Sequence, residues 1–319
     1  MRAFSPLPTV TDGAAPDDLL RGHLWILELI DGTGLRFRMD ETGLLRFGDP
    51  KATYADDGEV PLELRPAVRH VREEFDREAL RAAVNDPEGI TFFGVATHRR
   101  GTDYDWARLP PFLGTDVYAE DVDTEDVDTA DVSAEDAKGR EGAFRPPDAA
   151  AAIFEGVGLA PVDAVEREVN ARDFDPDAYA IPDSAWRDGP AAGVVVRNKR
   201  GGRGKITGEI GTEPANDGEP ANGGKPANDD ESIAAADDPD ALVESHATRE
   251  RFDRVVAAIE RHGDPVTVDS LTDRIVESLA RETPVSLGDG TRASVDPEGI
   301  RSAVVPRAQS FIDDRTDEW

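Results

Sequence analysis

Hydrophobic and polar positions follow two different periods along the chain, and the change divides it into regions. Three short apolar runs separated by turns containing Gly or Asp lie at 23–29, 34–39 and 44–48. Short runs with such turns predict the strands of an antiparallel meander. Further strand-like runs lie at 90–98, 111–117 and 193–198. The last run contains three consecutive Val, which is typical of a strand buried on both faces.

Apolar residues recur at helical spacing elsewhere. The first such group is Leu64, Val68, Val71 and Phe75, and it predicts one helix that continues toward position 84. A short helix is expected near 148–157. After position 240 the helical period dominates, through Phe252, Val255, Val256 and Ile259, and then Leu271, Ile275 and Leu279. Ser270 is expected to cap the second of these helices, and a last helix is expected over 297–313.

Two segments contain too few apolar residues to form a core. The segment at about 116–142 repeats a five-residue acidic unit, and the segment at 208–239 repeats a six-residue unit rich in Pro, Ala and Asn. Such composition predicts disorder. We therefore expect an α+β region at 1–207 with an acidic insert at about 116–142, a disordered acidic linker at 208–239, and a small helical C-terminal domain at 240–319.

Composition restricts the class of protein. The formal net charge is −31, and only Lys51, Lys138, Lys199, Lys205 and Lys225 are lysine among the basic residues. An acidic, lysine-poor surface is typical of a halophilic protein kept soluble at molar salt. The absence of Cys excludes disulfides and thiolate sites. Without a long apolar run, the chain is expected to be cytoplasmic, with no membrane partner.

Positive charge is concentrated at two places. Five of the nine residues at 197–205 are cationic, namely Arg197, Lys199, Arg200, Arg203 and Lys205. The glycines between them predict close contact with phosphate or nucleic acid. A second cluster comprises His98, Arg99 and Arg100. The other histidines lack metal-ligand spacing, so no metal site is expected from them.

The order of several motifs resembles that of the ATP-dependent RNA ligases of the covalent nucleotidyltransferase superfamily. The motifs are Glu-Leu-Ile-Asp-Gly-Thr at 28–33, Phe-Phe-Gly-Val at 92–95, Phe-Leu-Gly-Thr-Asp-Val at 112–117, Ala-Gly-Val-Val-Val at 192–196 and Arg-Gly-Lys at 203–205. The resemblance covers about 20–206. It implies an ATP-grasp-like nucleotidyltransferase (ligase) domain with antiparallel sheets, and the C-terminal part is similar to the helical domain of some such ligases.

What the family does is implied by this resemblance alone. A lysine attacks the α-phosphate of ATP, and the AMP then passes to a 5′-phosphate RNA end, with Mg²⁺ as cofactor. By matching position, Glu28 would read the adenine edge, Asp31 and Gly32 would form the motif turn, and Arg36 would follow on the next strand. Lys205 would contact the α-phosphate, and Lys51 is a weaker candidate for a phosphate contact.

The departures from the family pattern concern the chemistry. The nucleophilic lysine is replaced by Leu29, which has no lone pair. Two glutamates of the family pattern are replaced by Val95 and Ala192, an aromatic residue by Thr115, and the first lysine of the last motif by Arg203. Loss of a covalent nucleophile typically costs several orders of magnitude in rate.

Three hypotheses follow. The first is a catalytically degraded RNA-ligase relative, a pseudoenzyme that binds ATP or AMP and RNA ends, with RNA contacted by the two cationic clusters. The second is an active ATP-dependent RNA ligase that uses a substitute lysine, best Lys205, or accepts pre-adenylated ends. The third is a non-enzymatic interaction protein that recruits partners through its acidic repeats and helical tail.

Overall fold

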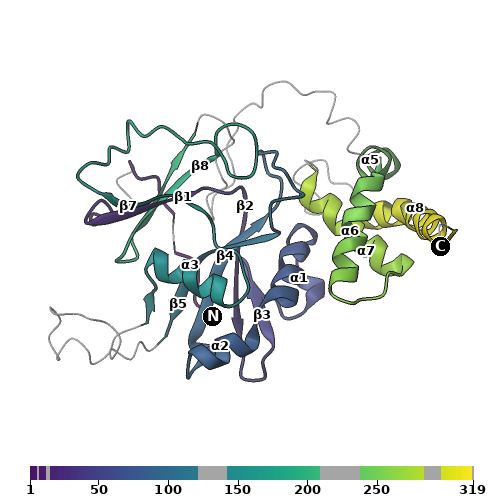
Figure 1. The fold of residues 1–319 in the computed structure, drawn as a ribbon, viewed down its shortest axis with the longest axis horizontal. Helices are drawn as coiled ribbons and strands as arrows, with labels where there is room; N and C mark the ends of the chain where they lie inside the picture. The colour runs from purple at the N-terminus through teal and green to yellow at the C-terminus, as the bar shows by residue number, and fades with distance from the viewer. Residues whose placement is uncertain (6, 12–14, 121–141, 209–237, 284–295, 318–319) are drawn as a thin grey trace.

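Two antiparallel sheets lie within the first 207 residues, and a group of helices follows them (Figure 1). The computed structural model describes residues 1–5, 7–11, 15–120, 142–208, 238–283 and 296–317. Most of the acidic insert and of the linker predicted from the sequence therefore lies outside the described residues. Among the described residues, no helix combines the length and hydrophobicity needed to cross a membrane.

The four-stranded sheet has the order β7-β1-β8-β9. Its strands are β1 (His23–Glu28), β7 (Ala164–Asn170), β8 (Gly193–Asn198) and β9 (Arg203–Thr207). Alternate side chains of β1 and β8 enter different cores, because successive residues of a strand point to opposite faces. Ile26 and Val196 pack in one cluster, and Trp25 and Leu27 pack in another. The prediction of a central strand at 193–198 is confirmed.

The five-stranded sheet has the order β3-β2-β4-β5-β6. Its strands are β2 (Gly32–Met39), β3 (Leu45–Gly48), β4 (Ile90–Thr97), β5 (Phe112–Ala119) and β6 (Ala143–Phe144). One face is covered by helices and is dominated by aromatic rings. Phe37 stacks on Phe92 with 4.9 Å between ring centroids, and Phe154 from the helix α3 (Pro147–Gly156) meets Phe92 edge-on. This aromatic layer belongs to the main core, where it packs among aliphatic side chains.

The helix predicted from position 64 toward position 84 is interrupted. It consists of α1 (Arg65–Glu74) and α2 (Arg77–Ala83), preceded by short 3-10 turns at Asp57–Glu59 and Leu62–Leu64, with another at Pro87–Gly89 after α2. Phe75 has extended backbone angles, and the Asp76 carboxylate accepts hydrogen bonds from two amides at the start of α2. Phe75 fits the apolar spacing of a single helix. Because Asp76 caps the start of a new helix, α1 nevertheless ends before Phe75.

The C-terminal residues form α5 (Pro239–His246), α6 (Arg249–Arg261), α7 (Val268–Glu282) and α8 (Pro297–Asp317). The helical positions predicted from the apolar spacing are confirmed. The N-cap of α7 is Thr267, not Ser270 as predicted. Ser270 instead occupies the third helical position, and its hydroxyl oxygen accepts a hydrogen bond from the Thr267 amide, which completes a capping box.

Helix α7 joins these helices to the two-sheet region. Glu277 forms a bidentate contact with Arg69 of α1 at 2.8 and 2.9 Å, and Arg274 contacts Glu73 at 2.8 Å. Arg281 reaches further, where it donates to the backbone oxygens of Thr97 and Leu109 at 3.0 and 2.6 Å. Burial lowers the pKa of Arg281 to about 10. The helices therefore pack on the two-sheet region through specific buried contacts.

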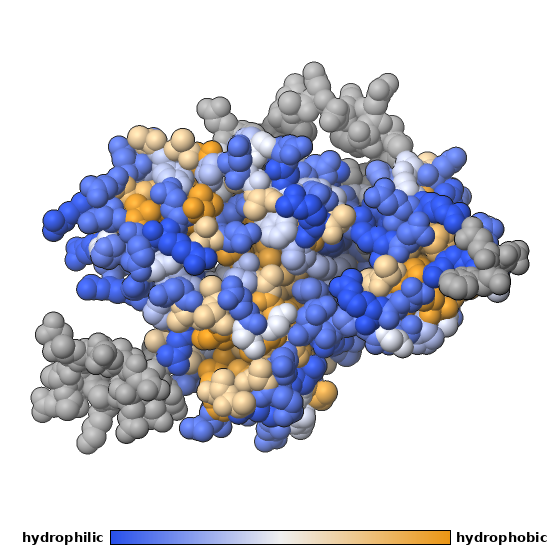
Figure 2. Space-filling view, in the orientation of Figure 1, coloured by the Kyte–Doolittle hydropathy of each residue, from blue (hydrophilic) through white to orange (hydrophobic). Residues whose placement is uncertain are grey.

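Strand β5 includes the first residues of the segment in which the acidic insert was expected. It continues to Ala119, and Tyr118 and Ala119 pair with Thr91 and Ile90 of β4. The apolar side chains of Val117 and Tyr118 are buried, which explains why the strand extends past position 116. Hydrophilic residues cover most of the face drawn in Figure 2, with a hydrophobic area in its lower part near α3.

We expect Arg281→Met to lower the free energy of unfolding by about 2–4 kcal/mol, because it leaves buried carbonyl groups without a donor. Urea denaturation in molar KCl, followed by circular dichroism, measures this. Arg315→Met is the matched control, since Arg315 pairs with Glu260 in an exposed position and its loss should cost at most about 1 kcal/mol. Equal midpoints for the two variants would contradict a structural role for the Arg281 contacts.

Candidate functional site

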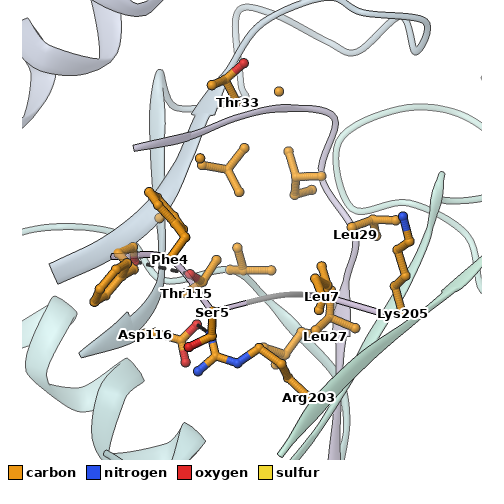
Figure 3. Close-up of a pocket in the computed structure, with 18 of the residues that line it drawn as sticks. Phe4, Ser5, Leu7, Leu27, Leu29, Thr33, Thr115, Asp116, Arg203 and Lys205 are labelled. Carbon is orange, nitrogen blue, oxygen red and sulfur yellow. Dashed lines mark hydrogen bonds and ion pairs between the residues drawn. The ribbon is translucent and has the colours of Figure 1, made fainter. Parts of the chain in front are cut away.

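A pocket with a volume of about 370 Å³ lies between the two sheets. All five motif segments named above contribute to its wall, although they are far apart in the sequence, and the segment 192–196 does so through Val195. The lining residues from those motifs are Glu28, Leu29, Ile30, Gly32, Thr33, Phe93, Gly94, Val95, Thr115, Asp116, Val195, Arg203 and Lys205. The topology thus brings the motif segments to one place (Figure 3).

The end of β1 forms one wall of the pocket. The Leu29 amide donates to the Gly193 carbonyl at 3.0 Å, which extends the pairing of β1 with β8 by one residue. The Leu29 side chain lines the cavity and is 9% exposed. The Glu28 carboxylate accepts hydrogen bonds from the Ser184 hydroxyl at 2.5 Å and the Ala185 amide at 3.0 Å. Burial raises the pKa of Glu28, and these two hydrogen bonds oppose the rise.

Asp31 and Gly32, which the resemblance places in the motif turn, lie where the chain passes from β1 into β2, and Gly32 is the first residue of β2. The Asp31 carboxylate accepts hydrogen bonds from the amides of Gly101 and Thr102, so it holds the loop after β4 rather than lining the pocket. A Cβ atom at Gly32 would lie 2.3 Å from the Ala96 carbonyl oxygen. Only glycine fits so close to the neighbouring strand.

His98 and Arg100 contact the first two residues of β2. The His98 Nε2 atom lies 2.8 Å from the Thr33 hydroxyl, and the Arg100 guanidinium donates to the Gly32 carbonyl at 3.1 Å. Burial lowers the pKa of His98 to about 3, and nearby arginines add to the effect. His98 is therefore a neutral, buried residue that supports the pocket, and Arg100 lines it.

A buried ion cluster crosses the gap between the sheets. Asp116 of β5 forms ion pairs with Arg197 of β8 and with Arg203 of β9, the second at 2.9 Å. Arg197 also donates to the Thr115 carbonyl at 2.7 Å. The side chains of Asp116 and Arg197 are 6% and 2% exposed. Burial lowers the pKa of Arg197, and the charge of Asp116 opposes that shift.

The N-terminal residues cover part of the pocket, which the sequence did not predict. We call residues 3–5 and 7–10 the N-terminal strap. The backbone of Lys205 bonds to this strap on both sides, through the Pro8 carbonyl and the Val10 amide at 2.8 and 2.9 Å. Phe4 packs edge-on against Phe93 at 5.1 Å between ring centroids. No motif marked these residues, and their only signal was an apolar, proline-containing start of the chain.

The remaining predicted site residues lie outside the pocket wall. Arg36 is buried beneath the strap, with its guanidinium 5.5 Å from the centre of the Phe4 ring. Lys51 is exposed, and Lys199 pairs with Glu168 at 3.1 Å. Arg200 is exposed at the turn between β8 and β9, and the Arg99 amide donates to the Arg281 carbonyl.

Two of the residues expected to contact RNA have buried side chains. Arg197 and His98 are bonded to residues of the protein. Their positions at the ends of β8 and β4 direct them inward, where charge and hydrogen-bonding groups are needed between the sheets. Within 197–205, the cations exposed to solvent are Lys199 and Arg200.

The carboxylates of the pocket do not form a metal site. Of the described residues that line the cavity, the acidic ones are Glu28 and Asp116, and both are engaged with protein donors. No group of three or more His, Asp or Glu side chains that could hold a metal occurs in the described part of the chain. These donors therefore do not fit the Mg²⁺ site that the resemblance implies.

No protein-family model and no curated protein sequence matches the chain. Among solved structures, it is similar to an archaeal ATP-dependent RNA ligase, with a TM-score of 0.41 and 14% identity over 88% of this chain and 63% of the other. A Naegleria gruberi RNA ligase solved with pyrophosphate gives a TM-score of 0.43 and 12% identity, over 65% of this chain and 56% of the other. The chain thus spans less than two thirds of either structure.

We expect the free energy of unfolding to decrease as the pH falls from about 7.5 to about 5.5. The unfolded chain binds protons at His near pH 6.5, whereas the folded pKa of His98 is about 3, so protonation favours the unfolded state. His98→Asn should remove about 1 kcal/mol of this pH dependence, measured by urea denaturation at each pH. Thr33→Val is the control, because it keeps the buried imidazole and should keep the pH dependence. An unchanged dependence in His98→Asn would refute the assignment.

Proposed function

We propose that the chain binds an adenine nucleotide in the pocket between the sheets without forming a covalent adenylate at position 29. The observation that carries this proposal is the convergence of separate motif segments on one cavity of about 370 Å³. That volume suits a small ligand. Glu28 lines it together with four cations, namely Arg100, Arg197, Arg203 and Lys205. Such groups complement a base edge and a phosphate.

Position 29 carries no group that can attack phosphorus. Leu29 lines the cavity where the resemblance expects the nucleophilic lysine, and Val95 lines it in place of a glutamate. Both replacements are apolar, so they remove the nucleophile and part of the charge stabilisation together. These apolar residues support nucleotide binding without self-adenylylation. They therefore support a ligase-like protein that lacks the first chemical step of the family, the formation of the lysyl adenylate.

Lys205 supports the second hypothesis, an active ligase. It lines the same cavity, and Figure 3 shows its side chain extending toward Leu29. In this alternative, the Lys205 amine would form a bond to the α-phosphorus of ATP, pyrophosphate would leave, and the amine would lose its proton to solvent. A covalent adduct on Lys205 would then replace the proposal of binding alone.

RNA ends remain a proposed partner. Lys199 and Arg200 lie exposed at the turn between β8 and β9, next to the strand that carries Arg203 and Lys205. Two exposed cations beside a nucleotide pocket are suited to the phosphate backbone of an RNA end. Weaker binding of a 5′-phosphorylated RNA by a Lys199→Met, Arg200→Met variant would support this part of the proposal.

Intact-mass measurement after incubation with ATP and Mg²⁺ in molar KCl tests the central proposal. We expect no mass gain in the wild type, together with nucleotide binding detectable by calorimetry. Lys205→Met should weaken binding by about tenfold or more, because it removes a charge-assisted contact of about 1.5–3 kcal/mol.

Lys199→Met is the matched control, since Lys199 does not line the cavity and pairs with Glu168 instead. It should bind nucleotide like the wild type. A gain of one AMP in the wild type would favour the active-ligase alternative, and peptide mapping would identify the modified lysine. Absence of both a mass gain and nucleotide binding would favour the interaction-protein hypothesis.

A further inference from the structure

Positive charges outnumber negative charges at the Asp116 corner of the pocket, and this difference limits how much ligand charge the pocket can neutralise. Asp116 supplies one carboxylate to two guanidinium groups, those of Arg197 and Arg203. The Nε and Nη2 atoms of Arg203 have no hydrogen-bond partner among the described residues, nor has the Nε atom of Arg197. Because buried donors are costly to leave unpaired, this corner favours an anion that accepts from them.

The surroundings of Arg203 orient these donors. Its guanidinium stacks on the Phe144 ring, 4.4 Å from the ring centre, and one of its nitrogens binds Asp116. The stacked, planar group presents its remaining N–H donors along its edge. Since Arg203 lines the cavity and Lys205 follows two residues later on the same strand, the two cations lie on one side of the pocket.

Much of the remaining wall is apolar and therefore unsuitable for a chain of phosphates. Leu29, Val95, Val162 and Val195 give it an apolar surface. A nucleoside triphosphate carries two more phosphate groups than a monophosphate, and their charge would be desolvated against these side chains. In proteins, Mg²⁺ commonly bridges such phosphates and is held in part by carboxylates. The two lining carboxylates among the described residues, Glu28 and Asp116, are already engaged.

The N-terminal strap further restricts the cationic side of the pocket. Ser5, Asp116 and Arg203 line the same cavity, and Figure 3 shows them in the same part of it. Phe4 anchors the strap against Phe93, and the backbone bonds at Lys205 anchor it further along. A phosphate chain extending past Arg203 would have to displace these contacts.

We infer that the pocket selects a nucleoside monophosphate over a nucleoside triphosphate, and that binding does not require a divalent metal ion. This inference rests on the proposed function, because it names the form of nucleotide that the same site takes. One phosphate group receives hydrogen bonds from Arg203 and Lys205, while the nucleoside occupies the apolar part of the cavity. Both lining carboxylates among the described residues are engaged by protein donors, and this engagement and the strap act together against a longer phosphate chain.

Calorimetric titration of the full chain with AMP, ADP and ATP in molar KCl tests the inference, each with excess Mg²⁺ and again with EDTA. We expect AMP to bind most tightly, ATP to bind at least about tenfold more weakly, and Mg²⁺ to change the AMP dissociation constant by less than about twofold. Tighter binding of ATP with Mg²⁺ than of AMP would overturn the inference and leave the proposed function intact. No binding of any of the three nucleotides would overturn the proposed function itself.

Two variants separate the causes. Phe4→Ala removes the anchor of the strap, so the ratio of the ATP dissociation constant to the AMP dissociation constant should decrease. Arg203→Met retains an unbranched apolar side chain and removes the charge, so it should weaken AMP binding by about tenfold or more. Lys199→Met is the control for loss of a cation outside the cavity. An unchanged AMP-to-ATP ratio in Phe4→Ala, with Arg203→Met binding AMP like the wild type, would refute the assigned roles.

Discussion

The ion cluster of Asp116, Arg197 and Arg203 is the interaction on which the pocket depends. Its carboxylate comes from the five-stranded sheet and its guanidinium groups come from the four-stranded sheet. Because the cluster is buried, removal of one partner would leave an uncompensated charge, which is far more costly than loss of an exposed pair. The cluster therefore fixes the spacing of the sheets and provides the pocket with its positive side. In the proposed function, architecture and ligand recognition would depend on the same three side chains.

The other contacts around the pocket are arranged about this cluster. Asp31 binds the loop that carries His98 and Arg100, and the strap pairs with the backbone of Lys205. Helix α7 reaches the same loop, since the Arg281 carbonyl accepts from the Arg99 amide. A side of the pocket is thus supported by residues nearly two hundred positions away in the sequence. The C-terminal helices consequently contribute to the stability of the site without lining it.

The sequence predicted local structure well and side-chain environments less well. Apolar spacing located β1, β4, β5, β8 and the C-terminal helices, because periodicity depends on neighbouring residues. It did not locate β7, whose side chains are mostly exposed, or the strap, which is ordered by contacts with distant residues. Glu28, Gly32 and Lys205, which the motif order singled out, line the pocket together with Arg203, which was expected to contact RNA. Whether an arginine such as Arg197 faces RNA or Asp116 is decided by long-range packing, which no local pattern records.

Burial also determines which charges can recognise a ligand in so acidic a chain. At about 1 M salt, interactions between exposed charges are screened over roughly 3 Å, whereas buried pairs are screened much less. Exposed cations such as Lys199 and Arg200 therefore contribute weakly under such conditions, and a desolvated group such as Arg203 retains most of its attraction for an anion. Leu29 increases this desolvation, because it adds apolar surface to the same cavity. In the proposed complex, the side chain of Leu29 thus strengthens the electrostatic contact of Arg203 with a phosphate.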